Sequence, residues 1–124
     1  MPSNGFEKNV VLRERLNAAL NFIKTNYHLN ISLSEIAETA FYEKHYFLRQ
    51  FKREFKITPW RFLQEIRLKH AKDLLLDTNK KLNEISNEVG FYDQGSLSRL
   101  FKIRYGFSPT DFKKEKPDYK GVAP

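Results

Sequence analysis

Apolar side chains recur along the first quarter of the chain at the spacing of an amphipathic helix. Intervals of three and four residues place side chains on one face of an α-helix, which turns once every 3.6 residues. These positions are Leu12, Leu16, Ala19, Leu20, Ile23 and Tyr27. The pattern predicts one helix over residues 9–26, which ends at the turn-forming run of residues 28–31.

Two later stretches of the chain repeat one pattern of apolar and polar positions about fifty residues apart. The first begins at Leu33 and the second at Leu82, and they align when a one-residue gap is placed opposite Gly90. The matched pairs are Ile36 with Ile85, Tyr42 with Tyr92, Phe47 with Leu97, Arg49 with Arg99, Phe51 with Phe101, Lys52 with Lys102 and Pro59 with Pro109. Such a repeat in a short chain predicts two copies of one supersecondary unit.

Local signals at the helix ends supply the boundaries. Ser32, followed three residues later by Glu35, has the form of a capping box. Thr58 before Pro59 puts proline at the first helical position, where its missing N–H costs nothing. Further helices are predicted over residues 33–39, 44–55, 59–76, 82–89 and 94–105, with a last short one from residue 109. Strand-like alternation is absent, so the sequence predicts an all-α fold of about seven helices, with two helix-turn-helix subdomains joined by a long linker helix.

The domain organisation follows from these elements. It comprises a disordered N-terminus (1–8), a first helix-turn-helix subdomain (9–57), a linker helix (58–77), a second helix-turn-helix subdomain (78–115) and a disordered tail (116–124). The tail is expected to be disordered because it holds two prolines and a glycine.

Composition narrows the choice of partner and location. Twenty-two Lys and Arg against fifteen Asp and Glu leave a net charge of +7, which favours a polyanionic partner. The absence of cysteine excludes disulfides, thiolate metal sites and cysteine nucleophiles. No stretch approaches the roughly 18 apolar residues of a membrane span, so we expect a cytoplasmic protein with no membrane partner.

The longer helix of each repeat separates apolar from basic side chains around its axis. At 100° per residue, the aromatic residues of the first helix lie opposite its basic residues. The inner set is Phe47, Phe51 and Phe55, and the outer set is His45, Arg49, Lys52 and Arg53. In the second helix, Leu97, Phe101 and Tyr105 lie opposite Gly95, Arg99 and Lys102. A helix-turn-helix with a basic outer helix predicts binding to double-stranded DNA, with the outer helix in the major groove.

Position along the helix separates two kinds of DNA contact. Arg49 and Arg99 occupy matched outward positions, which favours contact with bases or phosphates for both. Basic residues late in their helices are better placed for backbone phosphates, which position a protein without specifying sequence. We assign Lys52, Arg53 and Lys102 to this group, and we list Lys44 as a further phosphate contact.

The predicted linker helix sets the expected distance between the two copies. About 18 residues at 1.5 Å each span roughly 27 Å, close to the roughly 34 Å of one DNA turn once the flanking turns are added. The two outer helices are therefore expected in successive major grooves, on an asymmetric site. Arg67 and the other basic residues of the linker are expected on its solvated sides, from which a few could reach the DNA between the grooves.

The sequence also resembles the DNA-binding domain of the AraC/XylS transcriptional regulators across residues 32–113. The resemblance rests on four motifs: S-L-x-x-I-A at 32–37, R-L-x-x-A-x-x-L-L at 67–75, I-x-x-x-x-G-F at 85–91 and F-K-x-x-x-G-F-S-P at 101–109. It implies two helix-turn-helix subdomains bridged by a long helix. It also implies binding of operator DNA to regulate transcription, most often as an activator, with RNA polymerase as a further candidate partner. Family members often carry an effector-sensing or dimerisation domain, which we expect to be absent from this chain.

The resemblance assigns base-contacting positions. These are His45, Leu48 and Arg49 in the first outer helix and Gln94, Gly95, Ser98 and Arg99 in the second. His45 is equally compatible with a solvated surface position. Gly95 has no side chain to offer a base, and Leu48 offers only an apolar contact, for example to a thymine methyl.

Departures from the family pattern fall at the turns of the first copy. Phe41 and Lys56 stand where the second copy has Gly90 and Gly106, so the first copy is expected to turn differently. Glu43, where the family often has serine, is expected to be a poorer cap and to bring charge close to phosphates.

Other functions remain open at this stage. A helical adaptor could bind acidic protein partners through the same basic faces, and a non-specific nucleoid binder could share the fold. An enzyme is disfavoured because the chain has no cysteine, no HExxH pair, no Gly-rich phosphate loop and three widely separated histidines. No catalytic, metal-binding or cofactor-binding residue is predicted.

Overall fold

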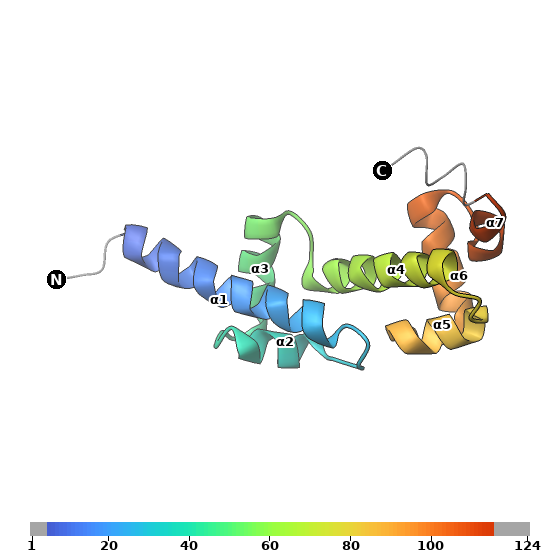
Figure 1. Ribbon diagram of the computed structural model, residues 1–124. Helices are drawn as coiled ribbons and strands as arrows, with labels where there is room; N and C mark the ends of the chain where they lie inside the picture. The colour runs from blue at the N-terminus through green and yellow to red at the C-terminus, as the bar shows by residue number, and fades with distance from the viewer. Residues whose placement is uncertain (1–4, 116–124) are drawn as a thin grey trace. The chain divides into compact units, whose positions relative to one another are not determined.

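The computed structural model describes residues 5–115, with side chains from residue 8 onward. Over these residues the structure contains seven helices and no strand (Figure 1). The helices are α1 (Gly5–Asn26), α2 (Leu33–Thr39), α3 (Lys44–Phe55), α4 (Pro59–Asp77), α5 (Leu82–Val89), α6 (Gln94–Tyr105) and α7 (Pro109–Lys114). The all-α fold predicted from the sequence is confirmed, and α2, α3, α5 and α6 have the predicted bounds. The predicted disorder of the tail lies outside the described residues.

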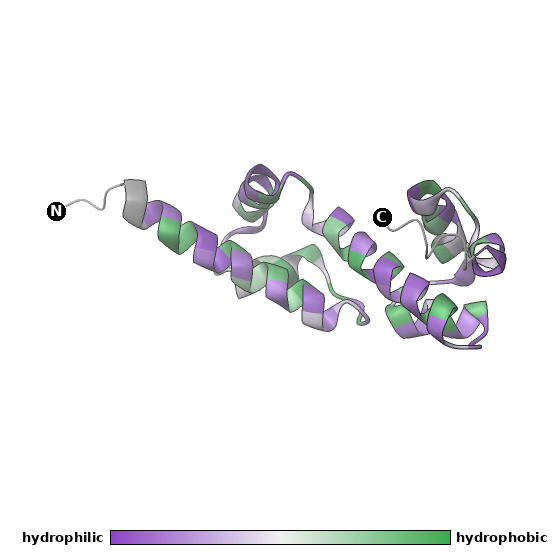
Figure 2. Cartoon of the chain, turned by 45° about the horizontal axis from the view of Figure 1, so that its top comes forward, coloured by the Kyte–Doolittle hydropathy of each residue, from purple (hydrophilic) through white to green (hydrophobic). Residues whose placement is uncertain are grey.

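Helix α1 begins at Gly5 rather than at residue 9, so the structure has helix over part of the segment predicted to be disordered. The apolar pattern does not reach this end of the helix, because Lys8, Asn9 and Val10 are exposed and stand outside the core. An apolar period marks only the part of a helix that meets the core. Farther along, α1 carries alternating hydrophobic and hydrophilic bands (Figure 2). Residues 1–4 of the predicted segment lie outside the described residues.

Contacts divide the chain into two compact units, and the division falls inside α4, between Gln64 and Glu65. Each unit therefore has a core of its own. The separate linker domain predicted over residues 58–77 stays a prediction.

The core of the first unit is built from α1, α2, α3 and the start of α4. Its fully buried side chains include Leu16, Ala19, Ile23, Ile36, Phe47, Phe51 and Leu63. The Phe51 ring lies 4.7 Å from the Phe55 ring and 6.3 Å from the Phe62 ring, measured between centroids. Each enclosed Phe contributes roughly 1.5–3 kcal/mol through removal of apolar surface from water.

The second unit repeats this packing with residues of α4 to α7. Its buried side chains include Leu68, Ala71, Leu75, Ile85, Val89, Leu97, Phe101 and Phe112. The Phe101 ring lies 4.7 Å from the Tyr105 ring and 5.3 Å from the Phe112 ring. The internal repeat therefore extends from the sequence to the aromatic contacts of the two cores.

Arg67 is buried in the second unit, which corrects the prediction of a solvated side chain. Only 5% of it is exposed, and its Cζ lies 5.9 Å from the centroid of the Phe91 ring. Burial lowers the pKa of the Arg67 guanidinium, because low-polarity surroundings disfavour the charged form. An aromatic face offsets part of that penalty, since the edge-positive, face-negative ring attracts a cation.

The turns between the paired helices differ by one inserted residue. The backbone N–H of Tyr42 donates to the Ala37 carbonyl, as that of Phe91 donates to the Ser86 carbonyl. Phe41 therefore takes the place of Gly90, and the residue without a counterpart is Tyr92, which is 92% exposed. The alignment gap belongs opposite Tyr92 rather than opposite Gly90.

Phe41 adopts a left-handed backbone conformation, with φ of 58° against 97° for Gly90. Left-handed geometry crowds the Cβ of an L-residue against the backbone, at a cost of roughly 1–2 kcal/mol. The Phe41 ring is 80% exposed, so burial offsets little of this cost. The first copy is one residue shorter at this turn, yet it keeps the left-handed position of the second copy with a residue that is strained there.

Replacing Phe41 with glycine is expected to raise the stability of the first unit. Glycine relieves the backbone strain, but it also gives the unfolded chain more conformational entropy, which favours unfolding. The net gain in the free energy of unfolding is about 0.5–1 kcal/mol. Trp60, the single tryptophan of the chain, lies in the first unit, so its fluorescence reports thermal unfolding there. The control Glu38→Gly, at an exposed position of α2, should lower stability by about 1 kcal/mol. A Phe41→Gly protein that melts below the parent would contradict the strain argument.

Candidate nucleic-acid interface

Helix α3 begins at Glu43, whose carboxylate accepts two backbone hydrogen bonds. Oε2 accepts from the N–H of His45 at 2.8 Å, and Oε1 accepts from the N–H of Tyr46 at 3.0 Å. These bonds lower the pKa of Glu43 from an ordinary value of 4.5 to about 2, because they stabilise the ionised form. Glu43 therefore caps the helix through its side chain, because the carboxylate reaches the first free N–H groups. Its ranking below serine stays a prediction.

Glu43 also holds the ring of His45, one of the predicted base-contacting residues. The Nδ1 atom of His45 lies 2.8 Å from Oε2 of Glu43, and both side chains are exposed. The contact fixes the orientation of the imidazole at the start of α3. In the second unit, Asp93 caps α6 in the same way, with Oδ1 accepting from the N–H of Ser96 at 2.7 Å.

The Glu43 cap predicts an acid-dependent stability of the first unit. Because the pKa of Glu43 is lower in the folded state, its contribution is fully present above about pH 4.5 and is lost as the pH falls towards about 2. We compare the melting temperatures of the parent and Glu43→Gln, each followed by Trp60 fluorescence. We expect the difference between them to become smaller as the pH falls over that interval. Glu38→Gln, at an exposed position that caps no helix, serves as the control. A gap that stays constant down to pH 2 would exclude the charged cap.

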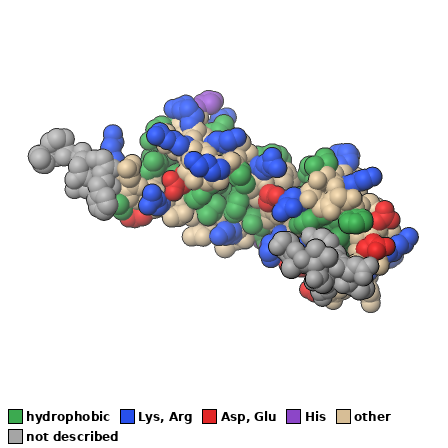
Figure 3. All heavy atoms as spheres, turned by 90° about the horizontal axis from the view of Figure 1, so that it is seen from above, with side chains coloured by type: hydrophobic (Ala, Val, Ile, Leu, Met, Phe, Trp, Pro, Cys, Tyr) green, Lys and Arg blue, Asp and Glu red, His purple; other side chains and the backbone are tan. Residues whose placement is uncertain are grey.

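Burial of the aromatic side of α3 fixes which side faces outward. Phe47 and Phe51 are fully buried, so the opposite side is presented to solvent. Of the predicted DNA contacts, Lys44, His45, Arg49, Lys52 and Arg53 are exposed and Leu48 is half-buried. Lys and Arg side chains gather over this part of the first unit (Figure 3). The first unit thus presents all six predicted residues on one helix.

Helix α6 presents the second set of predicted residues. Leu97 and Phe101 are fully buried, while Gln94, Gly95, Arg99 and Lys102 are exposed and Ser98 is half-buried. Ile103, one turn after Arg99, is 80% exposed and was not predicted as a contact. Its alignment with Arg53 in the repeat was the signal that could have found it.

The two matched arginines rest on different neighbours. The guanidinium of Arg49 lies over the Tyr46 ring, 5.9 Å from its centroid. Nη2 of Arg99 instead lies 3.4 Å from Oγ of Ser96, and Nη1 lies 3.4 Å from where a Cβ would stand on Gly95. Arg99 thus lies back towards the start of α6, where a Cβ on Gly95 would just touch its guanidinium.

The part of the chain that the structure describes holds neither a metal site nor a membrane-spanning helix. No group of three His, Asp or Glu side chains lies close enough together there to hold a metal ion. Within the same range, no helix has the length and apolar character required to cross a membrane.

A protein-family model described as a helix-turn-helix domain matches residues 36–115. The chain is 35% identical over 102 residues to the probable transcriptional regulator LumQ of Photobacterium leiognathi, covering 81% of this chain and 41% of that protein. It is 27% identical to the lactose operon transcription activator of Staphylococcus xylosus, covering 83% of this chain and 37% of that protein. The chain therefore spans about two fifths of the length of these curated relatives.

Solved structures share the fold. The C-terminal domain of AraT, a response regulator from Geobacillus stearothermophilus, superposes with a TM-score of 0.78 at 29% identity, covering 83% of this chain and 86% of that one. The DNA-binding domain of AdpA, solved in complex with a target DNA, has a TM-score of 0.79 at 19% identity, covering 87% of this chain and 97% of that one. The second likeness is evidence for the double helix-turn-helix fold.

Proposed function

The chain belongs to the AraC-type family of helix-turn-helix transcriptional regulators, and we propose that α3 and α6 are the helices with which it reads duplex DNA. The observation that carries this proposal is the matched pair of outer faces. Each helix buries an apolar side and exposes an arginine followed three residues later by a lysine, Arg49 with Lys52 and Arg99 with Lys102. The family is one of DNA-binding regulators rather than enzymes.

The outward residues divide into two roles in this proposal. His45, Leu48 and Arg49 contact bases from α3, and Gln94, Ser98 and Arg99 contact bases from α6. Arginine pairs well with guanine, whose O6 and N7 accept from its two parallel N–H groups. Lys44, Lys52, Arg53 and Lys102 contact phosphates and set affinity more than sequence preference.

The proposed site is asymmetric and about 15–20 base pairs long, with α3 and α6 in successive major grooves. The asymmetry follows from the different outward residues of the two helices. Among the curated relatives, the protein from Staphylococcus xylosus is named a transcription activator. We extend that role to this chain, with RNA polymerase as its partner and the cytoplasm as its location.

The test is selection of binding sequences from a random duplex pool, followed by affinity measurements on the selected and a scrambled duplex over a range of salt. We expect one asymmetric motif and an affinity at least 10³-fold higher than for scrambled DNA. Equal affinity for both duplexes would identify a non-specific nucleoid binder. An absence of binding even at low salt would reject DNA as the partner and favour the adaptor for acidic proteins.

A further inference from the structure

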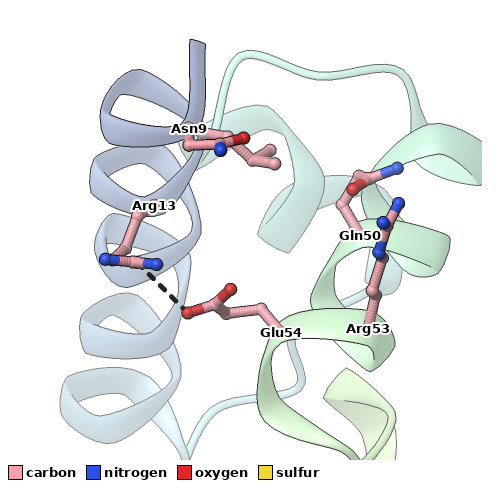
Figure 4. Close-up of a pocket in the computed structure, with 6 residues that line it drawn as sticks. Asn9, Arg13, Gln50, Arg53 and Glu54 are labelled. Carbon is pink, nitrogen blue, oxygen red and sulfur yellow. Dashed lines mark ion pairs between the residues drawn. The ribbon is translucent and has the colours of Figure 1, made fainter. Parts of the chain in front are cut away.

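Two adjoining hollows separate α1 from the flank of α3. The smaller, of about 220 Å³, is lined by Asn9, Leu12, Arg13, Gln50, Arg53 and Glu54 (Figure 4). The larger, of about 520 Å³, shares four of these residues and adds Lys8, Val11, Tyr42 and Tyr46. We call the two together the α1–α3 groove. The groove lies wholly within the first unit. Its α1 residues precede the range 36–115 that the helix-turn-helix family model matches.

The charges of the groove are unbalanced. Nε of Arg13 lies 3.3 Å from Oε2 of Glu54, so this pair is neutral and ties α1 to α3. Lys8 and Arg53 face the groove from the two helices, and neither has an acidic partner among the described residues. Folding therefore leaves two cations without an acidic counterpart at the edge of one hollow, an arrangement that attracts an anion.

The remaining lining fits a sugar–phosphate backbone better than an isolated anion. The side-chain amides of Asn9 and Gln50 and the hydroxyls of Tyr42 and Tyr46 can donate hydrogen bonds to phosphate oxygens. Val11 and the tyrosine rings supply apolar surface, which suits the face of a deoxyribose. Cations and neutral donors of these types make most protein contacts with DNA phosphates.

The position of the groove on α3 agrees with this ligand. Relative to Arg49, Lys52 lies about 60° to one side of the helix, whereas Arg53 and Gln50 lie about 40° and 100° to the other. A helix in the roughly 12 Å wide major groove has a phosphate backbone along each side. With Arg49 directed at the bases, Lys52 faces one backbone and the α1–α3 groove faces the other.

We propose that α1 is a third DNA-contacting helix, whose Lys8 binds, together with Arg53 of α3, the phosphate backbone at the edge of the site that α3 reads. This inference rests on the proposed function. The Arg13–Glu54 ion pair links α1 to α3 beside the groove, while the buried side chains of α1 hold the helix against the core.

The test compares Lys8→Ala and Arg53→Ala with Lys24→Ala, a control at an exposed lysine near the other end of α1. Affinity for the selected duplex is measured from 50 to 300 mM salt. Each of the first two variants should bind about 3–10-fold more weakly at the low-salt end and reduce the slope of log affinity against log salt by about 1. The selected motif should not change, because phosphate contacts carry no sequence information.

A Lys8→Ala protein with the affinity and salt slope of Lys24→Ala would overturn the inference, whatever Arg53→Ala does. That outcome is distinct from failure of the proposed function, in which the parent itself selects no motif. Because the substituted side chains are exposed, circular dichroism should show an unchanged fold.

Neutral methylphosphonate linkages, introduced one at a time into the selected duplex, locate the contact. One linkage beside the α3 half-site should weaken the parent but leave the Lys8→Ala, Arg53→Ala double variant unaffected. If no linkage behaves in this way, the inference is overturned. Inorganic phosphate at 10 mM should displace no more DNA than sodium chloride of equal ionic strength; stronger displacement would indicate a small-anion pocket instead.

Discussion

Replacing Phe101 with alanine is expected to unfold the second unit and to leave the first folded. Phe101 is fully buried, and its ring lies within 5.3 Å of the Tyr105 and Phe112 rings. Removing a buried Phe side chain costs roughly 3–5 kcal/mol, because it loses transfer free energy and leaves a cavity. A unit of this size has little more stability than that to lose.

The two units can be followed separately in one sample. Trp60 fluorescence follows the first unit, whereas far-ultraviolet circular dichroism sums the helices of both. In Phe101→Ala we expect a lower helical signal at 25 °C and an unchanged Trp60 transition. The matched control is Ile103→Ala on the same helix, which should change neither signal because Ile103 is 80% exposed. Simultaneous loss of both signals in Phe101→Ala would show that the units unfold as one.

Why the helices and cores could be predicted is clear from the ends of α4 and α6. Proline at the start of α4 and Gly106 after α6 act through their own backbone conformations, which are local properties. Buried residues such as Phe51 and Phe101 recur at helical spacing, so period alone identifies them. Signals of this kind require no knowledge of which element packs on which.

Features that depend on contacts between elements were mispredicted or missed. Arg67 looks like a solvated arginine in the sequence, and only the folded unit buries it beside the Phe91 ring. Likewise, nothing local to Lys8 indicates that it shares a groove with Arg53, forty-five positions further along the chain. The two capping bonds of Glu43 were not predicted, because a frequency preference for serine says nothing of the reach of the glutamate side chain.

Replacing Arg99 and Arg49 one at a time is expected to show which half of the site sets specificity. Truncating an arginine that pairs with guanine costs roughly 1–3 kcal/mol, or about 5- to 150-fold in affinity, and relaxes one position of the motif. We expect the relaxed positions to differ, one within each half-site. Repeating the selection with Arg49→Ala and Arg99→Ala gives the relaxed positions. Affinity measurements on the selected duplex give the loss of binding for each variant.

The larger effect is expected from Arg99. Its guanidinium rests against a serine hydroxyl at 3.4 Å and is attracted by the exposed Asp93 carboxylate. Solvent weakens that attraction, so Arg99 can turn to a base edge at small cost. Arg49 must first leave the Tyr46 ring, a cation–π contact of roughly 0.5–1 kcal/mol at an exposed site, so its net contribution to binding is smaller. Lys102→Ala is the control, because loss of a phosphate contact should weaken selected and scrambled duplexes alike. An Arg99→Ala protein that discriminates between those duplexes as sharply as the parent would remove Arg99 from the base-contacting residues. The stacking argument has its own test: Arg49→Ala should cost more affinity in a Tyr46→Ala protein than in the parent.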